Sequence, residues 1–397
     1  MGKGERLART LRDRPRVRRR ERWLIRLVDT MLLAMLSVAG MAIFVVQQQS
    51  RPQQVVSVVP SPTSTQSETT QQIQPADATV PKVQTLDELV YNVQQAPPLE
   101  HDEALQAIVD GAMALAASKD LSTEPLSITL IDLKSNKIAG YQNQTLRYPA
   151  SVVKLFWLVI CEAQLDQGFL KADAPLAADL NAMVVYSDND AASRVFDRIT
   201  QTTSGDALSG TEYDTWLKHR LQINQFFRAA GYDGLSISQK NYPIYSLKLD
   251  GPDGRELQMH DEQQQPIRSL MSSDQAARLL YEIYTGKAVS ASRSQEMMAL
   301  LTRDLHPEAW KQQPDNSIAG FLGEPLPPDV RFASKVGLTT KVRNEVAFIE
   351  SADGETAYIL AVFGADPTYS QSADILPAIS HAVYTQMVQR APQHVGD

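Results

Sequence analysis

The chain has 397 residues, of which 43% are hydrophobic and 21% are charged, so it has ample apolar content for a sizeable core. Residues 1–26 hold eleven Lys/Arg against three Asp/Glu, a net of +8, which leaves −16 for the rest of a chain whose formal net charge is −8. Such an acidic body excludes broad nucleic-acid binding, and the single cysteine, Cys161, excludes an intrachain disulfide framework.

The N-terminal region predicts export from the cytoplasm. Residues 1–26 form a basic cytoplasmic segment, and 27–46 are predicted to be a transmembrane signal-anchor, because about 20 apolar residues suffice to cross a bilayer. A cleaved signal peptide ending at Ala42 is the alternative, although the apolar run continues beyond that residue. Both interpretations place the remaining chain outside the cytoplasm.

Residues 47–98 are rich in Gln, Pro, Ser and Thr and show no lasting helical or strand period. This composition predicts an extended linker that holds a folded domain away from a membrane. We place the folded domain at residues 99–392.

The hydrophobic pattern of that domain predicts a helix at 101–117, a mostly helical middle and a closing helix at 373–390. The predicted strands, two early and three late, are 127–133, 137–141, 331–338, 342–350 and 356–363. We therefore expect an α+β fold with one five-stranded antiparallel sheet from both chain ends, flanked by the terminal helices, with an inserted helical lobe. A cleft between lobe and sheet is the expected binding site.

The segment Tyr148–Cys161, YPASVVKLFWLVIC, predicts a helix that is apolar on every side and therefore buried. Its only charge is Lys154, and Ser151 precedes it by about one turn. With Pro149 at the first helical position, Ser151 falls where backbone N–H groups lack helical partners and an oxyanion is stabilised. A lysine in a dry environment loses basicity, so its neutral amine can take a proton from a serine hydroxyl. The pattern predicts a nucleophile with its base, although a lysine that reaches solvent fits the same spacing.

Two later stretches carry related polar groups. Ser187-Asp188-Asn189 lies before a predicted helix, where a turn or a helix cap is the alternative interpretation. Lys335 and Gly337 lie in a predicted strand, in which the glycine indicates either a bulge or the close approach of a ligand. Each signal is weak alone, and their order along the chain is the informative feature.

That order, Ser151-x-x-Lys154, then Ser187-Asp188-Asn189, then Lys335-Val336-Gly337, resembles the signature of the serine β-lactamase and penicillin-binding protein superfamily, class A β-lactamases in particular. The stretches SSDQAARLLYEIYTGKAVS and KVRNEVAFIESADGETAYILAVF resemble that family's later helix and last two strands. The resemblance spans 99–390 and implies a β-lactamase/transpeptidase-like fold. Together with the predicted signal-anchor, it predicts a single-pass protein of the bacterial inner membrane, with a cytoplasmic N-terminus and a periplasmic catalytic domain.

The resemblance implies a role for each motif residue. Ser151 is the expected nucleophile, Lys154 its proton acceptor and Ser187 the group that passes the proton to the leaving nitrogen. Lys335 is expected to place positive charge near both Ser187 and the substrate carboxylate. The residues expected to bind substrate are Asn189, Gly337, Leu338, Arg343 and Tyr242. Among these, the N–H of Leu338 joins that of Ser151 in the oxyanion hole, and Arg343 binds a carboxylate, with an exposed strand charge as the alternative.

Two departures from the family pattern limit the expected activity. Val336 replaces the threonine of Lys-Thr-Gly, so one hydrogen bond to a substrate carboxylate is lost, worth about 1.5–3 kcal/mol. Tyr242 occupies the place of the glutamate that activates water, and a phenol is a poor base at neutral pH. A long insertion follows, in which Glu256, Asp261 and Glu262 are candidates for a displaced base.

These features predict a serine hydrolase that forms an acyl-enzyme with β-lactams or related acyl-D-amino acid amides and releases it slowly. A D,D-peptidase acting on peptidoglycan stem peptides and a non-catalytic envelope binding module are the alternatives. The expected partners are a β-lactam or peptidoglycan-derived small substrate and the membrane, with no nucleic acid. The six histidines are scattered without metal-ligand spacing, so no metal or other cofactor is expected.

Overall fold

The structure is a computed structural model that describes residues 86–390. Its longer helices, of eleven residues or more, are α2 (Glu103–Ser118), α3 (Val153–Asp166), α4 (Ala174–Val185), α5 (Asn189–Thr200), α6 (Gly210–Arg228), α7 (Ser273–Tyr284), α8 (Ala291–Leu301) and α11 (Ile375–Arg390). The shorter helices and 3₁₀ turns are η1 (Leu86–Glu88), η2 (Ala150–Val152), η3 (Tyr245–Leu247), η4 (Gly254–Glu256), α9 (Pro307–Trp310) and α10 (Pro367–Gln371).

The strands form one sheet in the order β1-β3-β2-β7-β6-β5-β4. They are β1 (Glu100–His101), β2 (Leu126–Asp132), β3 (Lys137–Tyr141), β4 (Thr302–Arg303), β5 (Arg331–Leu338), β6 (Arg343–Glu350) and β7 (Ala357–Gly364). The expectation of five antiparallel strands is therefore wrong, because the sheet has seven and its β1–β3 pair is parallel. Both additional strands, β1 and β4, are two residues long, which is too short to show a strand period in the sequence.

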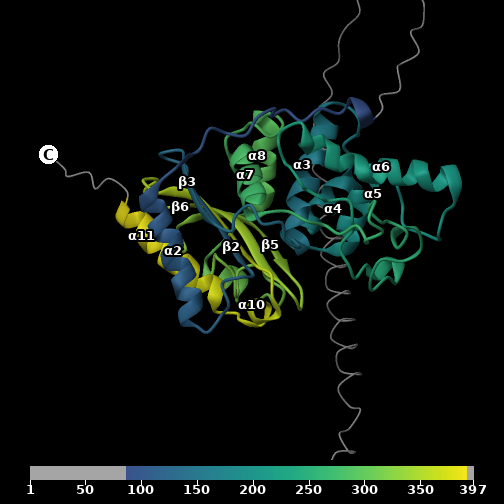
Figure 1. Ribbon diagram of the computed structural model, residues 1–397. Coiled ribbons are helices and arrows are strands. Elements are labelled where there is room, and N and C mark those ends of the chain that lie inside the picture. The colour runs from purple at the N-terminus through teal and green to yellow at the C-terminus, as the bar shows by residue number, and fades with distance from the viewer. Residues whose placement is uncertain (1–85, 391–397) are drawn as a thin grey trace, which may run out of the picture. The chain divides into compact units, whose positions relative to one another are not determined.

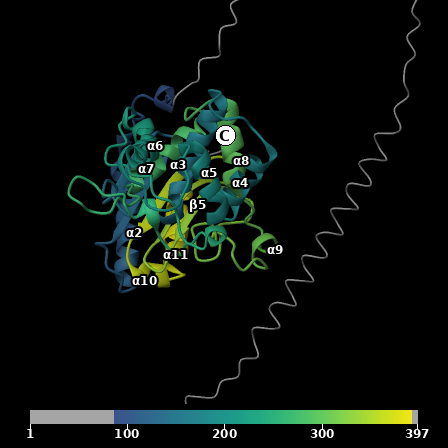
Figure 2. The same cartoon turned by 90° about the vertical axis from the view of Figure 1, so that its right-hand side faces the viewer.

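The sheet joins the two chain ends, as β2 pairs with β7 in antiparallel register from Leu126↔Gly364 to Asp132↔Tyr358. Helices α2 and α11 pack together on one side of it, and α7 packs on the other (Figure 1). Helices α3 to α6 form the helical lobe beside the β5 side of the sheet (Figures 1 and 2). The arrangement of sheet, terminal helices and inserted lobe agrees with the mixed α+β class expected from the sequence.

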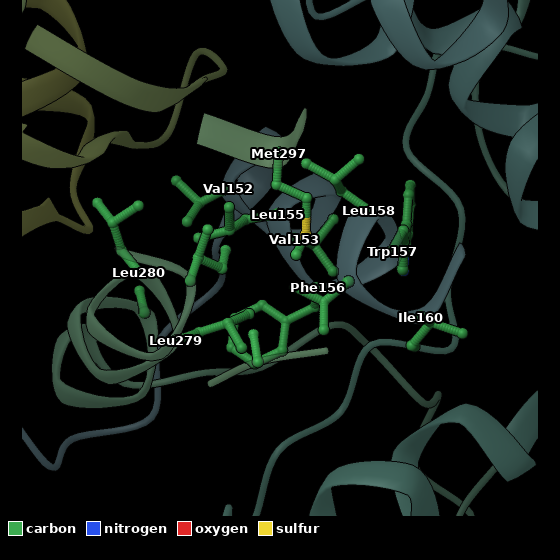
Figure 3. Packing of buried hydrophobic residues seen from close by; sticks show 14 of the residues in the cluster. Val152, Val153, Leu155, Phe156, Trp157, Leu158, Ile160, Leu279, Leu280 and Met297 are labelled. Atoms are coloured by element: carbon green, nitrogen blue, oxygen red, sulfur yellow. The ribbon is translucent and has the colours of Figure 1, made fainter. Parts of the chain in front are cut away.

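Helix α3 is the centre of the larger hydrophobic core. Every side chain from Val153 to Gln164 is buried, and Figure 3 shows Val153, Phe156 and Leu158 packed among Leu279 of α7, Met297 of α8 and their neighbours. The prediction that the α-helix includes Pro149 and Ser151 is wrong. Residues Ala150–Val152 form the 3₁₀ turn η2, and the α-helix begins at Val153. Cys161 is a buried free thiol in this core, and burial raises its pKa.

The residues before the first β-strand pack on the domain, although the sequence places them in the linker. We call Leu86–Leu99 the N-terminal strap. Tyr91 of the strap is 2% exposed and lies against the rings of Phe226 and Phe227 of α6. Its hydroxyl donates to Glu282 of α7, which also accepts from Tyr232 at 2.7 Å. The described packing against the domain therefore includes residues 86–98, which precede the predicted boundary at Leu99.

The segment expected to cross a membrane, residues 27–46, lies outside the described residues, as do residues 1–26 and most of the linker. Within residues 86–390, no helix combines the length and the apolar character that a bilayer span requires.

Candidate active site

The turn that carries Ser151 is pressed against strand β5. Ala150, immediately before the serine, has a positive φ of 47°, and Val152 N donates to Pro149 O at 3.2 Å. A Cβ atom on Gly337 would lie 2.5 Å from Pro149 O and 3.1 Å from Ser151 N. Only glycine at position 337 therefore allows the strand to approach this turn so closely. The sequence indicated such a close approach, and the approaching group is the backbone of the serine turn.

Lys154 lies in the first turn of α3 and is fully buried. Its Nζ donates to Ser187 O at 2.5 Å, to Asn189 Oδ1 at 2.8 Å and to Ser187 Oγ at 3.4 Å. Within residues 86–390 no hydrogen bond or ion pair joins Lys154 to a carboxylate. Burial lowers the pKa of Lys154 to about 7, against a smaller opposing influence of Asp188. An amine in this state can accept a proton near neutral pH.

Lys335 of β5 contacts Ser187 from the side of the sheet, opposite the helical lobe that carries Lys154. Its Nζ donates to Ser187 Oγ at 2.9 Å and to Val336 O at 3.1 Å. Burial, with a further contribution from Lys154, lowers the pKa of Lys335 well below its usual value. The hydroxyl of Ser187 thus lies between two buried amines, which is the position of a group that could pass protons between them and a bound substrate.

The backbone at Ser187 is held by the helix that follows it. Ser187 has a positive φ of 54°, and Asp188 caps α5 by accepting from Ala191 N at 2.6 Å. Asn189, the first residue of α5, accepts from Lys154 and donates from Nδ2 to Pro243 O at 3.1 Å. The motif therefore serves both as a helix cap, the alternative interpretation given above, and as a set of partners for Lys154.

An open groove of about 790 Å³ runs from Ser151 along β5. It is lined at one end by Ser151, Ser187 and Asn189, in its middle by Val336, Leu338 and Arg343, and at the far end by residues 314–324 and 373–377. The N–H groups expected to form the oxyanion hole belong to Ser151 and Leu338, which both line this groove. The structure thus brings together all the expected site residues except Tyr242, with Lys335 and Lys154 reaching it through Ser187 and Gly337 through the serine turn.

Tyr242 does not line the groove. Its hydroxyl is buried and has no hydrogen-bond partner within the described residues. Its neighbour Pro243, joined to it by a cis peptide bond, is the residue that contacts the site, through the carbonyl that binds Asn189. The carboxylates considered as replacement bases lie elsewhere too. Glu256 accepts from Arg220 and Ser204 in a buried ion-pair cluster, and Asp261 and Glu262 are exposed in a turn of the insertion.

Arg343 lines the groove, but the residue is only 7% exposed and its guanidinium is already bonded to other groups. Nη1 donates to Gly320 O and Nη2 to Ser370 O, each at 2.9 Å, and the group stacks over Phe321. The residue therefore fastens the 316–324 loop and the end of α10 to β6. Neither the carboxylate-binding role nor the exposed strand charge expected from the sequence describes these contacts.

Sequence reasoning missed two charged residues beneath the site, the half-buried Arg303 and the fully buried Glu345. Arg303 donates from Nη2 to Val184 O at 2.9 Å and to Ser334 O at 3.2 Å, which ties the end of α4 to β5, and burial lowers its pKa to about 10. Glu345 of β6 accepts from Leu322 N at 2.6 Å, and burial raises its pKa to about 7. The available signal was a charge inside an apolar run, as in NEVAFI for Glu345.

The chemistry available to this arrangement is acyl transfer. A serine hydroxyl, a buried amine of lowered pKa and a second hydroxyl shared by two amines meet at one end of an open groove. Among residues 86–390 no group of three or more His, Cys, Asp or Glu side chains could hold a metal ion.

Comparison with known proteins gives two kinds of match. The model of the Beta-lactamase enzyme family matches residues 175–387, more than half of the chain. That match starts after Ser151 and Lys154 and includes Ser187, Asn189 and Lys335. No curated protein matches the chain in sequence.

Among solved structures, the L158E mutant of PBP-A, an acyl-enzyme complex with penicillin G, matches with a TM-score of 0.51 and 15% identity, over 74% of this chain and 99% of that one. A β-lactamase from Sphaerobacter thermophilus matches with a TM-score of 0.51 and 16% identity, over 72% and 98%. One from Chitinophaga pinensis matches with a TM-score of 0.50 and 16% identity, over 72% and 99%. At these identities the likeness concerns the fold.

Proposed function

The chain belongs to the beta-lactamase enzyme family, and on that premise we propose that it is a serine hydrolase that forms an acyl-enzyme on Ser151 with β-lactams or related acyl-D-amino acid amides and releases it slowly. The observation that carries the proposal is the hydrogen-bonded set of Lys154, Ser187, Asn189 and Lys335 beside the Ser151 turn. In a binding module without catalysis, two buried lysines without a carboxylate partner among the described residues would have no use, because buried charges of this kind destabilise a fold.

The acylation step follows from these contacts. The Ser151 hydroxyl attacks the substrate carbonyl as its proton passes to the neutral amine of Lys154, so that a C–O bond forms. The N–H groups of Ser151 and Leu338 stabilise the oxyanion. Ser187 then delivers a proton to the leaving nitrogen as the C–N bond breaks, and it is replenished from the amines on either side. The hydrogen bond from Lys335 to Ser187 keeps that hydroxyl oriented.

Slow deacylation rests on what surrounds the groove. Hydrolysis of the ester needs a base to activate water, and Tyr242 offers only a buried phenol. Glu256 is held by Arg220 and Ser204. Of the three carboxylates that line the groove, Glu324 accepts from Gly320 N, Asp374 pairs with Lys119 and Asp315 is exposed to solvent. Within residues 86–390, none of the three is hydrogen-bonded to Ser151 or Ser187.

The test follows the intact mass of the purified full-length chain after mixing with benzylpenicillin, with Ser151→Ala as the control. The proposal expects a wild-type adduct of the drug's mass that persists for minutes to hours and is absent from the variant. Consumption of the drug without an adduct would indicate efficient hydrolysis and would contradict slow deacylation. No adduct and no consumption would contradict the proposal and favour a different acyl donor, such as a peptidoglycan stem peptide, or the binding-module alternative.

We also propose that the domain is held outside the cytoplasm by residues 27–46, with residues 1–26 on the cytoplasmic side. The support is the charge asymmetry, since basic residues before an apolar stretch stay in the cytoplasm. Fractionation of bacterial cells, followed by protease treatment of spheroplasts, tests this placement. The protein should sediment with membranes and its domain should be exposed to protease. Recovery in the soluble cytoplasmic fraction would contradict it.

A further inference from the structure

Beside Ser151, the groove has no accessible cation among the described residues. Lys335 is 1% exposed, and its Nζ is already bonded to Ser187 Oγ and Val336 O. Among the described residues that line the groove, Arg343 is the only Lys, Arg or His. Its two terminal nitrogens are bonded to Gly320 O and Ser370 O, and its Nε is buried. A carboxylate that bound this guanidinium would have to displace two carbonyl partners and lift it from Phe321. Lys341, on the turn after β5, is exposed and lies outside the lining.

The part of β5 that lines the groove with Ser151 is apolar. Val336 and Leu338 both line the groove, and Leu338 is 49% exposed. Neither side chain can donate a hydrogen bond. A carboxylate placed against them would lose hydration without gaining a partner, which is unfavourable.

Most of the charges that line the groove are negative, because Arg343 is outnumbered by Glu324, Asp374 and Asp315. Glu324 lies close enough to Arg343 to oppose its charge, and Asp374 at the far end is paired with Lys119. Asp315 is exposed, and within residues 86–390 no ion pair or hydrogen bond holds its side chain. None of these three carboxylates would attract a substrate anion, and the exposed Asp315 would repel one.

From these three observations we propose that the leaving-group side of this site is selective for substrates that are uncharged or cationic beside the scissile bond, and that it discriminates against those bearing a carboxylate there. The inference rests on the proposed acyl-enzyme function and specifies its substrate class: neutral amides, esters or amidated peptides rather than free acids. Val336 and the engaged state of Arg343 are the features that set the preference.

A competition between two acyl donors tests it. Benzylpenicillin and its methyl ester open by the same attack on the same ring carbonyl, and differ only in the carboxylate. Their adducts on Ser151 differ by one methylene in mass, so both are read in a single intact-mass spectrum of the full-length protein after brief exposure to an equal mixture. The ratio of adducts gives the relative acylation rate, independent of protein concentration or active fraction.

The expected wild-type ratio favours the ester or is equal. Val336→Thr, which supplies the missing hydroxyl, should shift the ratio toward the free acid by about tenfold, the usual worth of one hydrogen bond to a charged group. Asp315→Asn should shift it by about twofold at low ionic strength and less in high salt, because the charge is exposed and screened. Asp214→Asn on α6, an exposed aspartate outside the groove, is the matched control and should leave the ratio unchanged.

A wild-type ratio that favours the free acid by tenfold or more would overturn the inference, as would a folded Val336→Thr variant with an unchanged ratio. Absence of both adducts from the wild type, with a native unfolding transition, would instead remove the acyl-enzyme function itself. The two failures are therefore distinct.

Discussion

Two regions of this molecule bury cations, and they do so in opposite ways. In the ion-pair cluster of Arg220, Glu256, Lys240 and Asp197, each cation has a carboxylate within 3.2 Å. Arg220 also lies between the rings of Phe196 and Trp216. In the lysine pair, Lys154 and Lys335, the partners are hydroxyl, amide and carbonyl oxygens, and the described residues give neither lysine an ion pair.

The difference separates anchoring from chemistry. A buried cation with a carboxylate keeps its charge and holds segments together, here the insertion through Glu256 and the helical lobe through Arg220. A buried lysine without one loses its proton more easily, which weakens the fold but supplies a base. Among residues 86–390, the two fully buried lysines that lack a carboxylate partner both lie at the groove, where a neutral amine can act as a base.

The largest expected effect comes from removing the amine of Lys154. Lys154→Met should lower the rate of Ser151 acylation by about 10²–10⁴-fold, because the general base is lost. Its free energy of unfolding should change by no more than about 1 kcal/mol, since loss of the hydrogen bonds is offset by removal of a buried charge. Adduct formation with a penicillin and urea unfolding measure the two quantities.

The matched change in the other region is Lys240→Met, which strands Asp197 and should destabilise the fold by about 3 kcal/mol or more. If Lys154→Met and Lys240→Met lowered the free energy of unfolding equally, the proposed difference between the lysine pair and the ion-pair cluster would be wrong.

The ion-pair cluster should respond as a unit. Arg220→Met should lower the free energy of unfolding by about 3–5 kcal/mol, because Glu256 would remain buried without its partner. Combining it with Glu256→Leu should recover a large part of that loss, since an apolar pair replaces an unpaired charge. Urea unfolding of the single and double variants completes the cycle. Strictly additive losses would show that the pair does not act together.

The lysine pair predicts a pH dependence of intermediate size. Acylation requires neutral Lys154, so its rate should rise about tenfold per pH unit below a midpoint near 7 and then level off. The folded pKa is about 7 and the unfolded value about 10.4, so the unfolded chain binds more protons between these values. The contribution of Lys154 to stability therefore increases with pH across that window and is flat below it.

Stopped-flow acylation and urea unfolding of wild type and Lys154→Met, each measured from pH 6 to 10, test both statements. A wild-type midpoint near the ordinary lysine value would contradict the lowered pKa.

The smallest expected effect concerns Tyr242. Tyr242→Phe removes a buried hydroxyl that has no partner within the described residues, so the acyl-enzyme lifetime should change by less than about twofold and stability should not fall. Tyr245→Phe, at an exposed position, is the matched control. A lifetime several-fold longer in Tyr242→Phe alone would identify the phenol as a participant in deacylation.

Much of the site was predictable because its residues carry local signals. The single lysine in an apolar helix indicates a buried amine, and the serine one turn earlier indicates a nucleophile beside it. The glycine in a strand indicates a close approach of another group to the backbone. The fold brings these segments together. The neighbours that hold them were less visible. Arg303 bonds to carbonyls of α4 and β5, and nothing in the sequence near either strand or helix indicates that pairing.

The features in which the structure differs from the predictions share one origin, because each depends on contacts between residues distant in sequence. The two-residue strands β1 and β4 form because a partner strand is adjacent, and a window of two residues has no period. The sequence predicts that Arg343 binds a carboxylate, whereas its guanidinium is bonded to the carbonyls of Gly320 and of Ser370 in α10. Tyr91 belongs to a polar, Pro-containing stretch, and its burial depends on an aromatic cluster of α6 and a carboxylate of α7.

The strap has a mechanical consequence for any load applied through the residues that precede it. A pull that reaches the strap at Leu86 acts first on the contacts of η1 and Tyr91 with α6 and α7, and reaches β1 and the sheet only after those contacts yield. Gln167 holds the same stretch through two hydrogen bonds with the backbone of Val90. These contacts therefore take up such tension before it reaches β1 and the sheet to which β5 belongs.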